Sequence, residues 1–236
     1  AEKTYIAGDD DQAIFKWAGA DVDHFIALKE EVNDIKILDQ SYRIPGGPIH
    51  ELSQNIINKV QNRFQKEYKP REEQGLLKRY SDITQVDMSL GNWLVLSSAN
   101  YFLEDAKDLC EIQGWYYQCK GINSVPLKLL LALNNWEAWR KGGFLNQLEI
   151  KNIYEYLGSN VTVGYQKGKT LHSDAKYTLK ECQEQHGLIA SDVWYNSFEG
   201  LDPMTETYIR NMRANGETLN KNPRIKMSTI HAAKGG

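Results

Sequence analysis

The chain has 236 residues and a formal net charge of −3, from 28 Lys and Arg against 31 Asp and Glu. Hydrophobic residues make up 41% and charged residues 25%, a composition typical of globular proteins that excludes a histone-like polycation. The three cysteines lack metal-ligand spacing, which argues against a disulfide scaffold and a zinc site, and no apolar run is long enough to cross a membrane. We therefore expect a cytoplasmic, intracellular protein with a sizeable core.

The first third of the chain predicts a small α/β layer. Residues 4–7 and 35–38 are short apolar runs that predict strands, and the first of them ends in the acidic turn 8–11. Apolar residues at helical spacing predict a helix over 49–64. Residues 66–90 are polar and predict a loop with a basic patch, for which a solvated face is the default interpretation. The patch consists of Lys66, Lys69, Arg71, Lys78 and Arg79.

The remainder of the chain alternates between the two kinds of structure. A strand at 93–96, a helix at 103–112 that ends at Gly114, and a strand at 115–119 together indicate a parallel α/β layer. From Pro126 the pattern becomes mostly helical, and it returns to strand-like alternation at 224–230. The predicted helices of this part are 127–139, 145–157, 175–185 and one that begins at Asp202 and Pro203. The expected fold is a parallel sheet interrupted by a helical insertion.

One candidate site lies in the segment GDDDQAIFKWAGA at 8–20, where a predicted strand meets an acidic turn. Ligands of open α/β sheets bind at such strand ends. Gln12 could orient a water or a phosphate oxygen, and Phe15 and Trp17 could stack on unpaired bases. The alternative is an acidic loop followed by two core aromatics.

Two further segments carry residues suited to phosphate or base contacts. In LDQSYRIP at 38–45, Arg43 could pair with a phosphate through two hydrogen bonds, and Tyr42 could lie flat on a purine. In KMSTIHAAKGG at 226–236, small residues next to His231 and Lys234 would let the backbone approach a phosphate. An ordinary turn between a strand and a helix is the alternative for the last segment.

In this order and at these spacings, GDDDQAIFKWAGA, LDQSYR and STIHAAKG resemble motifs III, IV and V of the UvrD/Rep-like helicases of superfamily 1, whose patterns are close to GDxxQxIYxWRGA, LxxNYR and TxHxAKG. The stretch LVLSSAN at 94–100 is similar to the family segment that reaches toward single-stranded DNA. The resemblance implies two RecA-like domains of the P-loop NTPase type, with ATP and Mg²⁺ between them. It also implies 3′ to 5′ movement on single-stranded DNA and unwinding at duplex junctions.

The resemblance assigns both domains and roles. It implies that 1–32 end the first RecA-like domain, 33–125 begin the second, 126–222 form its helical insertion and 223–236 return to it. Gln12 and Arg43 match the catalytic glutamine and arginine finger, and Tyr42 matches the residue that stacks on adenine. The residues that match or adjoin DNA-facing positions are Phe15, Trp17, Asn100, Thr229, His231 and Lys234. No metal ligand is assigned.

The sequence departs from the family pattern at Ala18, Ser41 and Ser98, where the family commonly has Arg, Asn and Arg. Two cations expected to contact DNA are thereby missing, and Lys16 could compensate for Ala18. The chain contains no GxxxxGK[ST] phosphate loop, so we expect a fragment of a longer helicase that does not hydrolyse ATP by itself.

Two other functions stay open. The first is a non-catalytic DNA- or protein-binding module derived from a helicase, with the helical insertion docking a partner. Trp136, Trp139 and Tyr154 could form such a docking patch, although helical spacing favours a core position for the two tryptophans. The second is a translocase joined to a nuclease, which ranks low because the chain shows no nuclease-type carboxylate cluster.

Overall fold

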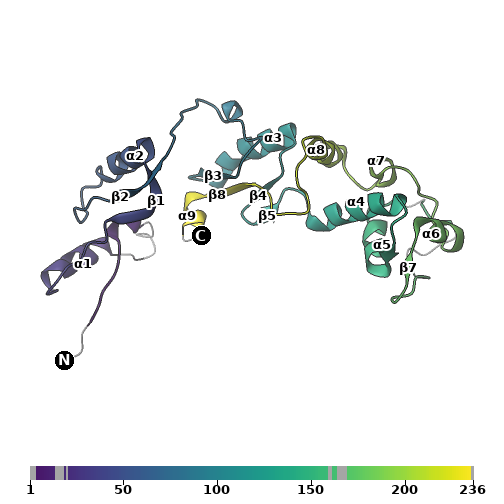
Figure 1. Cartoon of the computed structure of the whole chain (residues 1–236), viewed down its shortest axis with the longest axis horizontal. Helices are drawn as coiled ribbons and strands as arrows, with labels where there is room; N and C mark the ends of the chain where they lie inside the picture. Colours follow the sequence, from purple (N-terminus) through teal and green to yellow (C-terminus); the bar gives the residue numbers. More distant parts are fainter. Residues whose placement is uncertain (1–3, 14–18, 20, 159–160, 164–168, 235–236) are drawn as a thin grey trace. The chain divides into compact units, whose positions relative to one another are not determined.

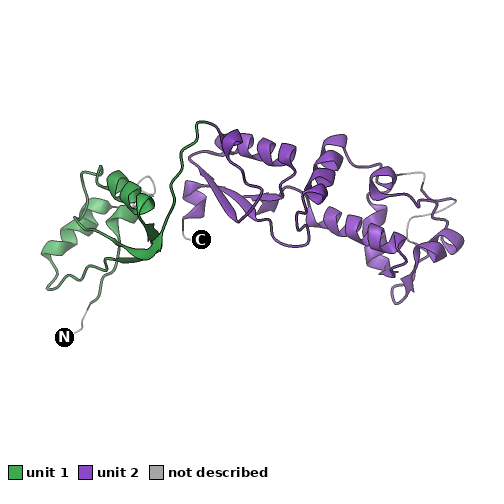
Figure 2. Cartoon of the chain, turned by 45° about the horizontal axis from the view of Figure 1, so that its top comes forward, with its two compact units in different colours: residues 1–81 green, residues 82–236 purple. Residues whose placement is uncertain are grey.

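The computed structural model describes residues 4–13, 19, 21–158, 161–163 and 169–234 (Figure 1). The predicted DNA-binding residues Phe15 and Trp17 lie outside these ranges, as do Lys16 and Ala18. The chain divides into two compact units, residues 1–81 and 82–236 (Figure 2). Both units contain parallel strands, so the protein is of mixed α/β class. No described helix combines the length and the hydropathy needed to cross a bilayer.

The first unit is built around a strand–helix–strand connection. Strand β1 and strand β2 pair in parallel, and helix α2 forms part of the crossover that such a pair requires. Gly47 turns the chain from β1 into α2 with a φ of 70°, and Pro48 occupies the first turn of the helix. The elements are η1 (Asp10–Gln12), α1 (Val22–Ala27), η3 (Leu28–Glu30), β1 (Gln40–Gly46), α2 (Pro48–Ile57) and β2 (Lys69–Gln74).

Four predictions for this unit were wrong: two strands, a loop and the end of a helix. Residues 4–7 and 35–38 are exposed and belong to no strand, because no described strand pairs with them in a ladder. The paired strands are β1 and the polar β2, which falls within the predicted loop. Helix α2 ends at Ile57, well before Phe64, whose backbone N–H donates instead to the Asp10 carboxylate at 2.6 Å.

The second unit contains a sheet with strand order β3-β8-β4-β5. Strands β3, β8 and β4 are parallel, and β5 forms a hairpin with β4. The strand predicted at 224–230 is therefore present as β8, and it lies between two strands from much earlier in the chain. The elements are η4 (Ile83–Gln85), β3 (Trp93–Ser97), η5 (Asn100–Leu103), α3 (Glu104–Gln113), β4 (Tyr117–Cys119), β5 (Ile122–Asn123), α4 (Leu127–Arg140), β6 (Leu145–Asn146), α5 (Gln147–Tyr154), β7 (Lys176–Tyr177), α6 (Leu179–Gln185), α7 (Trp194–Ser197), α8 (Pro203–Ala214), β8 (Ile225–Thr229) and α9 (Ile230–Ala233).

Local sequence signals set the ends of several of these helices. Asp202 accepts a hydrogen bond from the backbone N–H of Thr205 at 2.9 Å and so caps α8, as its position before Pro203 predicts. Helix α3 ends at Gly114, which has a φ of 67° and packs so closely on α8 that a Cβ atom would lie 2.6 Å from Cβ of Asn211. The helix predicted at 175–185 is shorter because Lys176–Tyr177 pairs with β6 instead.

One hydrophobic core joins the sheet to the helical region of the second unit. Trp136 and Trp139 are fully buried in it, with ring centroids 6.1 Å apart in an edge-on arrangement. Each indole N–H donates to a backbone oxygen, that of Asp192 at 3.0 Å and that of Tyr177 at 2.8 Å. Tyr154 is also buried, so these aromatics stabilise the core and do not form a docking patch.

We expect Trp136→Ala to lower the free energy of unfolding of the second unit by about 3–5 kcal/mol, because it leaves a cavity in a close-packed core. The measurement is urea denaturation of the full chain followed by far-UV circular dichroism. Leu148→Ala is the control, since Leu148 lies on α5 with its side chain mostly exposed. Equal effects of the two substitutions would contradict the core assignment.

Candidate functional site

The acidic segment of the first candidate motif forms the short 3-10 turn η1. Asp9 caps the turn by accepting a hydrogen bond from the backbone N–H of Asp11 at 3.2 Å. The turn brings carboxylate oxygens of Asp9, Asp10 and Asp11 within 4.8 Å of one another. Three like charges at this separation repel, so the turn requires cations close by.

Two basic side chains from the segment after α2 supply this charge. The Arg63 guanidinium donates to both carboxylate oxygens of Asp11, from Nε at 2.9 Å and from Nη2 at 2.7 Å. The Lys66 ammonium donates to Asp10 and lies 3.3 Å from Asp9 and 3.1 Å from Asp11. Both side chains are nearly buried, with 2% of Arg63 and 9% of Lys66 exposed. We call Asp9, Asp10, Asp11, Arg63 and Lys66 the ion cluster.

Hydrogen bonds keep the ion cluster charged. Burial raises the pKa of Asp9, but hydrogen bonds from Gln12, Tyr68 and Lys66 more than offset this and hold the pKa below its usual value. The pKa of Asp10 is also lowered, because Lys66 and the Phe64 N–H outweigh burial. For Tyr68, burial and the neighbouring Asp9 charge raise the pKa to about 12.

The ion cluster is therefore not suited to hold a divalent metal. A metal ion bound by the three carboxylates would have to displace the Lys66 ammonium, which is shared by all three. The pKa of Lys66 is raised, because hydrogen bonds from its ammonium to Asp10 and Asp11 outweigh its burial. The ion cluster is thus a turn in which each carboxylate already contacts a cation, with one negative charge in excess.

Gln12 is attached to this turn through one of its acids. Its side-chain amide donates to Asp9 Oδ2 at 2.6 Å, while the Tyr68 hydroxyl donates to the same carboxylate at 3.1 Å. The side chain of Gln12 is exposed. The orientation of Gln12 thus depends on Asp9, and that of Asp9 depends on Tyr68 and Lys66.

Tyr42 and Arg43 lie on a bulge of β1. The register advances five residues on this strand, from Gln40 to Pro45, while β2 advances only two, from Lys69 to Arg71. Ser41 stabilises the bulge, because its hydroxyl accepts a hydrogen bond from the backbone N–H of Ile44 at 3.1 Å.

The bulge displays both side chains to solvent. Tyr42 is 83% exposed, and Arg43 is exposed without an ion pair in the described part of the chain. Ser41, where the helicase motif that this segment resembles has asparagine, supplies the acceptor that such a turn needs. Arg43 and Gln12 belong to the same compact unit.

The other predicted contacts lie at one edge of the sheet in the second unit. Ser97 of β3 and Thr229 of β8 are register partners at the carboxyl ends of parallel strands. Asn100 starts η5 just after β3, and His231 lies in α9 just after β8. Both η5 and α9 contact both strands, so the structure brings the two segments to the same edge.

Most of the side chains at this edge face solvent. Asn100, His231 and Lys234 are exposed, as is Ser98. The Thr229 hydroxyl accepts a hydrogen bond from the Ala232 backbone N–H at 3.3 Å and caps α9. Thr229 therefore shapes the turn that presents its neighbours, in addition to any contact with a ligand.

Sequence reasoning missed the cationic half of the ion cluster. It placed Lys66 in a solvated patch and did not single out Arg63 or Tyr68. Three adjacent aspartates do imply nearby cations, but the partners follow more than fifty positions later, at no spacing that a motif could reveal. The other patch members Lys69, Arg71, Lys78 and Arg79 are exposed, as predicted.

Comparisons of the chain with protein-family models, with curated proteins and with solved structures found no match. The roles of the predicted residues therefore rest on the motifs and on the geometry described above.

We expect Lys66→Met to destabilise the first unit by about 3 kcal/mol at neutral pH, because it leaves three carboxylates around an apolar side chain. The pKa values of Asp9 and Asp10 are lower in the folded protein than the value of 3.8 in the unfolded chain. These two carboxylates therefore stabilise the fold above pH 3.8, and the stabilisation is lost as the pH falls through their folded-state pKa values. The cost of Lys66→Met should accordingly shrink below about pH 4.

The measurement is urea denaturation of the full chain, followed through the amide NMR signals of residues 63–74 at neutral and acidic pH. Lys69→Met is the matched control, since Lys69 pairs with Asp39 at 2.6 Å on the surface. This substitution should lower the free energy of unfolding by less than about 1 kcal/mol. A pH-independent cost of Lys66→Met would contradict the charge-based account.

Proposed function

We propose that this chain is the motif III to V part of an ATP-dependent DNA helicase of the UvrD/Rep-like type, which moves 3′ to 5′ on single-stranded DNA. The observation that carries the proposal is the order of GDDDQAIFKWAGA, LDQSYR and STIHAAKG along the chain. One such segment alone would have little weight. Three in family order, with a helical region between the last two, are hard to obtain by chance.

The fold of the second unit is compatible with this proposal. Its parallel strands lie in the order β3-β8-β4, and α3 connects β3 to β4 along the chain. Part of a RecA-like sheet would have this arrangement. The chain then leaves the sheet after β5 and returns at β8, as expected for a domain with an inserted helical subdomain. We propose that 126–222 are this insertion.

The β1 bulge suits one wall of a nucleotide site. The exposed Tyr42 ring offers a flat face to adenine, and the Arg43 guanidinium offers paired donors to a phosphoryl oxygen. Gln12, oriented by Asp9, would sense the terminal phosphate. The phosphate loop and the Mg²⁺ ligands would come from outside these 236 residues, since the sequence contains no GxxxxGK[ST] and the Lys66 ammonium already contacts all three carboxylates of the ion cluster.

The sheet edge suits a single-stranded DNA contact. Asn100 and His231 are exposed hydrogen-bonding side chains on neighbouring segments, and both follow strand ends. Backbone and side-chain groups at such an edge can donate hydrogen bonds to DNA phosphates, and these contacts do not depend on the base sequence of the DNA. Helicase action at a duplex junction would combine this contact with the nucleotide wall.

The test uses the full-length protein that contains these residues. We expect Arg43→Ala to lower its DNA-stimulated ATP hydrolysis by about 10³-fold or more, because an arginine finger stabilises the charge of the transition state. The KM for ATP should change little. The measurement is phosphate release with and without single-stranded DNA.

Arg79→Ala is the matched control, since Arg79 is an exposed arginine of the same unit outside the motifs. If DNA-stimulated hydrolysis is absent in the wild type, or survives Arg43→Ala, the helicase proposal fails. DNA binding without hydrolysis would favour a non-catalytic binding module.

We expect this chain to bind a fluorescein-labelled oligo-dT, with an affinity that falls as salt rises. The double substitution Asn100→Ala and His231→Ala should weaken binding by about tenfold, because two polar contacts to the strand are lost. Fluorescence anisotropy is the measurement, and His172→Ala, an exposed histidine away from the sheet edge, is the control. Equal affinity of the double variant and the control would remove the sheet edge from the DNA path.

A further inference from the structure

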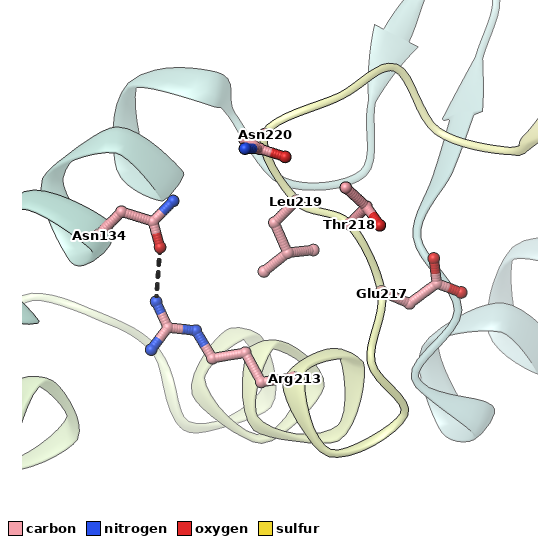
Figure 3. Close-up of a pocket in the computed structure, with 6 residues that line it drawn as sticks. All are labelled: Asn134, Arg213, Glu217, Thr218, Leu219 and Asn220. Carbon is pink, nitrogen blue, oxygen red and sulfur yellow. Dashed lines mark hydrogen bonds between the residues drawn. The ribbon is translucent and has the colours of Figure 1, made fainter.

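An open pocket lies in the helical part of the second unit, and none of its lining residues belongs to a motif. It is lined by Asn134 of α4, Arg213 of α8 and residues 217–220, which lead into β8. In Figure 3, Arg213 reaches from α8 toward Asn134, while Leu219, Thr218 and Asn220 lie on the opposite wall. The pocket has a volume of about 500 Å³, which is ample for a phosphate group.

The Arg213 side chain is held in place without an acidic partner. Its Nη2 donates to Asn134 Oδ1 at 3.0 Å, and its guanidinium lies 5.5 Å from the ring centroid of the buried Trp194. It makes no ion pair within the described ranges. A guanidinium has five N–H donors, so most of those of Arg213 have no acceptor among the residues that the structure describes.

Two acids near Arg213, Glu137 and Glu217, are bound to other groups. Glu137 accepts from Arg140 at 2.9 Å and from the backbone N–H of Trp194 at 3.0 Å. Glu217 accepts from Arg224 at 3.0 and 2.6 Å, and its carboxylate points away from Arg213 in Figure 3. Burial lowers the pKa of Arg213 although the charge of Glu137 raises it, as expected for a cation without a close anion.

The opposite wall adds further hydrogen-bonding groups. The side chains of Thr218 and Asn220 are exposed and have no hydrogen-bond partner in the described part of the chain. A hydroxyl and an amide thus lie across the pocket from an oriented guanidinium. Leu219 is buried between them and fixes the segment against the core.

We propose that this pocket binds a phosphate-type oxyanion, with Arg213 as its principal ligand and Thr218 and Asn220 as additional donors. A planar guanidinium matches two oxygens of such a group. The anion is either a backbone phosphate of DNA or a free phosphate or nucleotide. The site shares no residue with the proposed helicase motifs, so it stands independently of that function.

The first test titrates inorganic phosphate into the full ¹⁵N-labelled chain at constant ionic strength, with chloride as the balancing anion. We expect saturable shifts of the Arg213 Nε–H and of the backbone amides of residues 217–220. In Arg213→Gln the amide shifts should be lost, and in Arg213→Lys binding should weaken by about tenfold, since an ammonium lacks the paired donors.

Arg210→Gln is the matched control, because Arg210 lies one turn earlier on α8 and already pairs with Glu206 at 3.2 Å. It should bind phosphate as the wild type does. Should Arg213→Gln fail to fold, the double substitution Thr218→Ala and Asn220→Ala provides the test from the opposite wall, with an expected affinity loss of severalfold. Absence of saturation in the wild type, or unchanged binding by the folded variants, would overturn the proposal.

The second test identifies the source of the anion with a short fluorescein-labelled DNA duplex. If Arg213→Gln weakens duplex binding relative to Arg210→Gln and lowers the salt slope by about one, the anion is a DNA backbone phosphate. If duplex binding is unchanged while inorganic phosphate still saturates the site, the anion is a free phosphate or nucleotide. Both results support an oxyanion site.

Discussion

The second unit depends on the pairing of β8 with two strands at once. Ile225–Thr229 hydrogen-bonds to β3 on one side and to β4 on the other, although both partners precede it by about a hundred residues or more. The chain between β5 and β8 must therefore leave the sheet and return to its middle. Arg224, just before β8, secures the return by donating to Glu217 and to the backbone oxygen of Met88. The helical region and the sheet consequently share one core.

In the first unit, contacts between opposite charges hold distant segments of the chain together. Buried charges stabilise a fold only when each has a partner. Arg63 pairs with Asp11, Lys66 contacts all three carboxylates, and the Tyr68 hydroxyl donates to Asp9, so every carboxylate has a partner although one negative charge is in excess. This arrangement connects η1 to the segment before β2. The orientation of Gln12 in the proposed function thus depends on residues that no helicase motif contains.

Local signals in the sequence predicted most of the second unit. The Asp202–Pro203 pair, Gly114 and the apolar run at 93–96 act within a few residues, so the helix and strand ends that they predict are confirmed. Strand pairing in the first unit depends on distant partners, which explains why 35–38 was wrongly predicted and the polar β2 was missed. The same distance concealed Arg63 and Lys66. The motif roles of Gln12, Tyr42 and Arg43 came from the resemblance, and they stay predictions.

The ion cluster and the α8 pocket differ in local charge, which the net charge of −3 does not reveal. At the ion cluster, the Lys66 ammonium is shared by three carboxylates, so an added ion would compete with existing contacts. At the α8 pocket, Arg213 has an amide and an aromatic face but no anion, while the nearby acids are bound by Arg140 and Arg224. An incoming oxyanion would gain a charged partner there without breaking an ion pair of Arg213 among the described residues. The pocket of Arg213 is thus the better candidate for a ligand site than the acidic turn that the sequence emphasises.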